Sequence, residues 1–128
     1  MNSLAHDLRA RPSDAVSLMN HYLDVVQDGD RLEALRRTAL LDSPPEEAFD
    51  RLTRMATTVL HVPVALVSLV DSDRQFFKSQ CGLPEPLASL RQSPLTHSFC
   101  KHAIGSREPL VVTDARQHLR FAHNPIVS

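Results

Sequence analysis

The chain has 128 residues, of which 42% are apolar and 23% charged, and its 14 Lys and Arg nearly balance 15 Asp and Glu, giving a net charge of −1. This size and composition predict one folded domain and exclude a chain that is disordered throughout. Without a basic patch, the charge pattern argues against binding to nucleic acid or to an anionic membrane surface.

The cysteines and the hydropathy pattern indicate the compartment. Two cysteines form neither a disulfide framework nor a paired zinc motif. The longest apolar run, Val62–Val70, contains Pro63 and Ser68 and is far too short to span a bilayer. The N-terminus lacks the apolar core of a signal peptide. We therefore expect a cytoplasmic protein without a membrane segment.

Residues 1–30 are predicted to form an N-terminal leader and one helix. Residues 1–12 are polar and end in a proline, and Ser13 and Asp14 are suitable N-caps for a helix reaching about Gln27. Apolar residues recur along this helix as a seam, at Ala15, Met19, Tyr22 and Val26. So short a seam either covers the core of its own domain or pairs with a second copy, and both remain open.

Two further helices are predicted before the sheet. The first follows a turn at residues 27–30, has Leu32, Leu35 and Ala39 on one side, and reaches Leu41. The second begins at a capping box, in which Ser43 is the N-cap, Pro44 is the first helical residue and Glu46 reaches back. An apolar stripe then follows the second helix, at Phe49, Leu52, Met55, Ala56, Val59 and Leu60.

The centre of the chain predicts a hairpin. Val62–Val70 is a β-branched, apolar strand, residues 71–74 form a turn, and Gln75–Cys81 returns as a second strand. A strand pair joined by so tight a turn is antiparallel. Residues 82–94, with three prolines, are predicted to be a loop.

The last third of the chain predicts three short elements. Residues 96–104 form a short helix that Gly105 ends, residues 108–114 a third strand, and residues 115–121 a short helix or turn. The expected fold class is therefore α+β, with an antiparallel sheet flanked by helices.

The stretch "SFCKHAI", residues 98–104, is the candidate for chemistry. On a helix Cys100 and His102 lie about 200° apart, so they cannot hold one metal ion together. His97 shares a face with Cys100, but two ligands do not make a zinc site, and no metal site is predicted. Cys100 is either a packed apolar residue, which we favour, or a nucleophile activated near a helix N-terminus. No other catalytic motif occurs, so no catalytic residue is predicted.

Four segments in this order resemble a GAF domain of the bacterial type found in signalling proteins: "RLEALRRTALLDSPPEEAFDRLTRMA", "VPVALVSLVDSDRQFFKS", "SFCKHAI" and "EPLVVTDARQHLRFAHNPIV". The resemblance covers residues 31–128 and leaves residues 1–30 outside it. The family fold continues beyond the last of these segments into further strands and a closing helix. The resemblance therefore implies a GAF-like domain that is truncated at its C-terminal end.

The resemblance also implies a ligand pocket on one face of the sheet, roofed by short helices and loops. It assigns ligand contacts to Val67, Leu69, Phe99, Cys100, Ala103, Asp114 and Phe121. The ligand and any cofactor stay unidentified. The sequence lacks the motif of cyclic-nucleotide-binding members, and Lys101 stands where bilin-binding members have His.

The function implied is a non-catalytic sensory or dimerisation module of a bacterial signalling protein. It would bind an unidentified small molecule or associate with a second copy, through the exposed sheet edge or the first helix. Similar domains commonly precede histidine kinase, cyclase or phosphatase domains. The alternative is a thiol-dependent methionine sulfoxide reductase of GAF type, with Cys100 as nucleophile and Cys81 as resolving cysteine.

Overall fold

A computed structural model of the chain describes residues 12–118. Three strands and five α-helices, with two short 3-10 turns, make up this part of the chain. In chain order they are α2 (Pro12–Val26), α3 (Gly29–Arg37), α4 (Glu47–Leu60), β1 (Ala65–Val70), β2 (Arg74–Cys81), α5 (Leu87–Leu90), β3 (Gln92–Pro94), η1 (Leu95–His97), α6 (Cys100–Ser106) and η2 (Ala115–Gln117).

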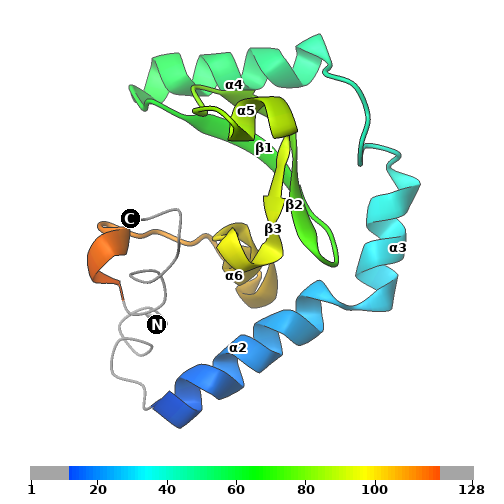
Figure 1. Cartoon of the computed structure of the whole chain (residues 1–128), viewed down its shortest axis with the longest axis vertical. Coiled ribbons are helices and arrows are strands. Elements are labelled where there is room, and N and C mark those ends of the chain that lie inside the picture. The colour runs from blue at the N-terminus through cyan, green and yellow to red at the C-terminus, as the bar shows by residue number, and fades with distance from the viewer. Residues whose placement is uncertain (1–11, 119–128) are drawn as a thin grey trace.

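The strands form one antiparallel sheet in the order β1-β2-β3, and helices cover both of its faces. Helix α4 lies along one face, whereas α6 lies against the other (Figure 1). β3 pairs only with the first half of β2, where Ser93 is opposite Gln75. The predicted α+β fold class with an antiparallel sheet is confirmed.

One extra residue in β2 decides which side chains face each side of the sheet. Val67 pairs with Ser79 and Ser68 pairs with Phe77, so Lys78 has no partner on β1 and forms a β-bulge. Because side chains alternate along a strand, Phe77 and Ser68 face α6, whereas Ser79 and Val67 face α4.

Helix α2 joins the core rather than standing apart from the domain. Val26 is completely buried and packs with Val70 and Leu95. The Tyr22 ring meets His102 of α6 edge-on, with 5.3 Å between ring centroids. These two members of the predicted apolar seam therefore cover the core of their own chain. The structure does not describe the side chains of Ala15 and Met19, nor residues 1–11. The boundary proposed at residue 30 stays a prediction.

Two predictions for the following helices are wrong. Helix α3 ends at Arg37 because Ala39, with φ of 58°, adopts a left-handed conformation. Helix α4 begins after Glu46, which makes no side-chain cap, so there is no capping box. The Ser43 hydroxyl instead donates to the Leu40 carbonyl and accepts from Lys78.

The apolar stripe of α4 is divided between two surroundings. Buried Thr53 and half-buried Phe49 and Ala56 face the sheet side, and Thr53 Oγ1 lies 2.9 Å from Ser79 Oγ. More than half of each remaining side chain of the stripe is exposed, namely Leu52, Met55, Val59 and Leu60. Polar contacts, not the apolar stripe alone, therefore join this helix to β2.

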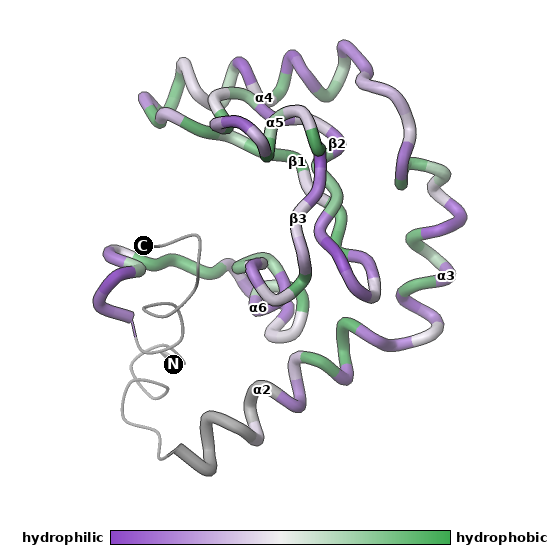
Figure 2. Tube along the Cα trace, viewed as in Figure 1, coloured by the Kyte–Doolittle hydropathy of each residue, from purple (hydrophilic) through white to green (hydrophobic). Residues whose placement is uncertain are grey.

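The predictions for the last third of the chain are partly wrong. Residues 108–114 form no strand, since no described strand lies beside them to supply hydrogen bonds. The apolar residues 110–112 instead run as an extended segment between α6 and η2 (Figure 2). The predicted loop 82–94 contains α5 and β3. The predicted helix 96–104 divides into η1 and α6, and α6 continues through Gly105 to Ser106.

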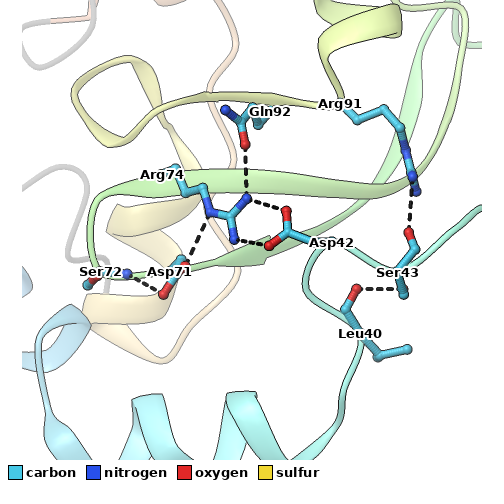
Figure 3. Close-up of polar contacts among 8 residues, drawn as sticks. All are labelled: Leu40, Asp42, Ser43, Asp71, Ser72, Arg74, Arg91 and Gln92. Carbon is cyan, nitrogen blue, oxygen red and sulfur yellow. Dashed lines mark hydrogen bonds and ion pairs between the residues drawn. The ribbon is translucent and has the colours of Figure 1, made fainter.

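Three cationic side chains hold the segment before α4 against β2. Arg74 makes a bidentate pair with Asp42, with N–O distances of 2.6 and 2.8 Å, and also donates to Gln92 (Figure 3). Arg91 donates to the Ser43 carbonyl at 3.0 Å. Lys78, which is 1% exposed, donates to Ser43 Oγ and the Pro44 carbonyl, each at 2.7 Å. We call these contacts the basic clamp.

Substituting Gly105 by alanine should loosen the contact between α2 and α6. A Cβ there would lie 2.8 Å from Tyr22 Cα, which is backbone and cannot rotate away. We expect Gly105→Ala to lower the free energy of unfolding by about 1–3 kcal/mol, the usual cost of overpacking. Relative to the parent chain, amide hydrogen exchange should become faster in α2 and change less in the sheet, which would place the effect at the contact between α2 and α6. Gly29→Ala is the control, since its Cβ meets nothing within 4 Å. Equal stability of both variants would contradict the prediction.

The clamp should also weaken in acid. Its hydrogen bond from Arg74 holds the pKa of Asp42 below the usual 3.8. A carboxylate with a lowered pKa in the folded state stabilises the fold above its unfolded pKa, and this contribution disappears as the pH falls through the folded value. Asp42→Asn should therefore lower the urea midpoint near neutral pH but not well below pH 3.8.

Asp73→Asn is the matched control for Asp42→Asn, because no described residue donates a side-chain hydrogen bond to the exposed Asp73 carboxylate. Its urea midpoint should stay close to that of the parent chain at both pH values. A pH-independent effect of Asp42→Asn would contradict the role of its charge.

Candidate functional site

A small apolar cavity lies between the sheet and the helices at its α6 face. Its volume is about 260 Å³. β1 and β2 supply its floor, and α5, β3, η1 and the start of α6 supply its walls. The lining residues are Leu66, Gln75, Phe77, Leu83, Leu87, Ser93, His97, Phe99 and Cys100.

A hydrogen-bonded network around Gln75 fixes one wall of this cavity. The Ser98 hydroxyl donates to Gln75 Oε1, and Gln75 Nε2 donates to Cys100 Sγ at 3.3 Å. Ser98 also accepts from the backbone N–H of Lys101 at 3.3 Å. Gln75 and Ser98 are both buried, so these bonds form out of water, and leaving either group unsatisfied would be costly. The network thereby orients the first turn of α6 on the sheet.

Cys100 is held as a packed thiol at the edge of this network. Its Sγ lies 3.5 Å from Ser68 Oγ and packs against the Val26, Val70 and Leu95 core. At the next residue, burial lowers the pKa of the Lys101 ammonium, since the charged form loses solvation. The favoured interpretation of Cys100 as a packed residue agrees with this environment.

Two of the residues assigned by resemblance, Phe99 and Cys100, line this cavity. Val67 and Leu69 do not, because they pair with Ser79 and Phe76 and so face the opposite side of the sheet. Their neighbour Leu66 lies at the cavity instead.

The other assigned residues lie elsewhere. Ala103 lines a second cavity, and Asp114 caps η2, where it accepts from Arg116 N at 3.0 Å. The side-chain hydrogen bond that the Arg116 guanidinium donates to the same carboxylate lowers the pKa of Asp114 and raises that of Arg116. Phe121 lies outside the described residues. The ligand contacts assigned to all seven residues remain predictions.

The second cavity, of about 470 Å³, is lined by residues of α2, the start of α3 and α6. Its lining mixes acidic and basic side chains, among them Asp24, Asp28, Arg31 and Arg107. Burial lowers the pKa of Arg31, although Asp71 and Asp28 oppose this shift. The Arg31 guanidinium donates to the Val26 carbonyl, at 2.6 Å from Nη2. Its cation thus ties α3 to the end of α2.

A third cavity, of about 440 Å³, lies on the α4 side of β2 and is lined by clamp residues Lys78 and Arg91 and by Cys81. The cations there already bind oxygens of the segment before α4. Cys81 Sγ lies 3.7 Å from Thr57 Oγ1 of α4. The two cysteines therefore occupy opposite faces of the sheet.

Neither a cluster of metal-ligating side chains nor a helix that could span a membrane occurs in the described part of the chain. Within residues 12–118, no three His, Cys, Asp or Glu side chains come together in a way that could hold a metal ion. None of the helices in that range combines the length and the apolar character needed to cross a membrane.

Most of the cavity lining was missed by analysis of the sequence. Leu83, Leu87 and Ser93 come from the segment predicted to be a loop, and Gln75 and Phe77 from a strand whose bulge gives no sequence signal. One signal was available: Gln75 and Phe77 are two apart on a strand and so share a face.

Comparison with known proteins identifies the family of the chain. The sequence model of the GAF domain matches residues 44–127. Over 88 residues, or 69% of its length, the chain is 36% identical to a cyclic di-GMP phosphodiesterase of Pseudomonas aeruginosa, and it spans 14% of that protein's length. The family match covers well over half of the chain and includes both the sheet and the cavity. The chain therefore belongs to the GAF domain family.

Proposed function

We propose that this chain is a non-catalytic sensory module that binds a small molecule in the cavity between the sheet and α6. The observation that carries this proposal is the cavity itself. It is concave, its walls are mainly apolar, and a few polar side chains converge on it, which is the usual composition of small-molecule sites. The Gln75 network holds its α6 wall in place without a ligand.

The signalling context comes from the relative. The chain matches 14% of a cyclic di-GMP phosphodiesterase, so a module of this kind can stand beside a separate catalytic region in one protein. By analogy, the proposed partner is a kinase, cyclase or phosphodiesterase domain in the same bacterial, cytoplasmic signalling protein. In that arrangement the ligand regulates the output domain and is not turned over.

A thiol-dependent reductase is the weaker candidate. It would need Cys81 and Cys100 to form a disulfide, for which their Cα atoms must approach within about 7 Å. Cys81 contacts Thr57 on the α4 face, whereas Cys100 contacts Ser68 and Gln75 on the other face. The sheet would have to rearrange before the two sulfurs could meet.

Self-association is a second function that one observation favours. Leu52, Met55 and Val59 follow one another on α4 at intervals of three and four residues, and each is more than half exposed. An exposed apolar stripe of this kind is typical of a surface that another protein segment covers. We propose a homodimer as its simplest occupant.

Ligand binding can be tested by filling the cavity. Leu87 lines it from α5, so Leu87→Trp should occupy the space and abolish binding. Leu90 is on the same short helix but is 61% exposed and outside the lining, so Leu90→Trp is the matched control. Native mass spectrometry after incubation with a small-molecule extract should show added mass on the parent chain and Leu90→Trp only. A bare mass for all three proteins would contradict the sensory proposal.

Self-association can be tested by placing a charge in the α4 stripe. Met55→Glu should shift sedimentation toward the monomer, because burying an unpaired carboxylate at an interface is costly. Ser89 is an exposed residue of α5, away from the stripe. Ser89→Glu adds the same charge there and should leave the sedimentation coefficient unchanged. A monomeric parent chain at micromolar concentration would contradict the homodimer.

A further inference from the structure

We infer that the ligand of the sheet–α6 cavity is a compact, uncharged and mainly apolar molecule with one hydrogen-bonding group, which pairs with the hydroxyl of Ser93. This inference rests on the proposed function and specifies its ligand. Five apolar side chains surround the site, contributed by both long strands, by α5 and the loop before it, and by the residue that precedes α6: Leu66, Phe77, Leu83, Leu87 and Phe99.

Ser93 supplies the polar contact. It lines the cavity and is only 5% exposed. Within the described part of the chain, its hydroxyl makes no hydrogen bond, and its oxygen is not fully enclosed, so a molecule in the cavity can reach it. The neighbouring Gln75 amide is already engaged by Ser98 and Cys100. A ligand group that pairs with Ser93 would therefore give this hydroxyl a partner without breaking the network.

The lining also argues against a charged ligand. None of the nine described residues around the cavity is Lys, Arg, Asp or Glu. Burying a phosphate or carboxylate without a cationic partner carries a large desolvation cost. The cations of β2, Arg74 and Lys78, belong to the basic clamp, where they already bind oxygens of the segment before α4. Within the described lining, which holds His97 but no Lys or Arg, the phosphates of cyclic nucleotides and cyclic dinucleotides would find no permanently charged cation.

The size of the cavity limits the ligand further. At about 260 Å³ it falls below the roughly 300–1,000 Å³ of sites for drug-sized molecules. One or two fused rings, or a short branched chain, match this space. Indole is a suitable probe because it is uncharged, has a single N–H donor, and can be followed by fluorescence in a chain that contains no Trp.

The test is a set of titrations on the intact chain. Indole should bind saturably, and indene, which has the same shape without the N–H, should compete with it. Ser93→Ala should weaken indole about fivefold to tenfold, which corresponds to one neutral hydrogen bond, and leave indene unchanged. Ser89→Ala, an exposed serine outside the cavity, should change neither. Indole-2-carboxylate and cyclic GMP should bind at least tenfold more weakly than indole.

The outcomes separate this inference from the proposed function. Binding of indole-2-carboxylate or cyclic GMP as tightly as indole would overturn the ligand class and leave small-molecule sensing intact. An equal effect of Ser93→Ala on indole and indene, or no effect on either, would overturn the role of Ser93. Binding of none of the four probes would overturn the ligand class, and bare masses in the cavity-filling experiment as well would remove the sensory proposal itself.

Discussion

The β-bulge at Lys78 is the constraint on which the rest of the structure depends. Without an extra residue, Phe77 and Ser79 would share one face of β2, as residues two apart normally do. With it, Phe77 lines the cavity while Ser79 reaches α4, where its hydroxyl donates to Asp50 and contacts Thr53. One strand thereby serves an apolar site on one side and a polar helix contact on the other.

The partners of Lys78 explain why a lysine can be buried at this position. Its ammonium is surrounded by the Ser43 hydroxyl, the Pro44 carbonyl and the Glu46 carboxylate, and it lies 5.4 Å from the centre of the Phe49 ring. Removing a charge from water is tolerated only with such compensation. The contacts in turn fix the chain between α3 and α4, which forms neither helix nor strand and contains a backbone hydrogen bond from Ser43 N–H to the Leu40 carbonyl.

Features set by local sequence could be predicted, whereas features set by contacts between distant residues could not. The hairpin was predictable because two β-branched and aromatic runs flank a short polar turn. Helix α4 was predictable from its apolar stripe, but its start was not, because Ser43 bonds to Lys78 from a strand 35 positions away. Local capping rules cannot represent so distant a partner.

The cavity was harder to predict for a related reason. Apolar residues occupy both faces of β1, so the sequence alone could not decide whether Val67 or Leu66 faces the site; a shift of one residue exchanges the faces. The three-residue strand β3, which contributes Ser93, is too short to leave a periodic pattern and ends in a proline. What the sequence did indicate is the segment at Phe99 and Cys100, through its resemblance to a known family.

Helix α6 has two roles that meet in a single short element. Cys100 at its start touches the cavity, and Gly105 near its end is the contact surface for Tyr22 of α2. A helix of this length spans only about 10 Å and moves as a rigid body. Any tilt of α6 that a change in the cavity produced would therefore displace its other end as well. A change at the cavity wall would therefore reach the surface on which α2 packs, through α6 alone.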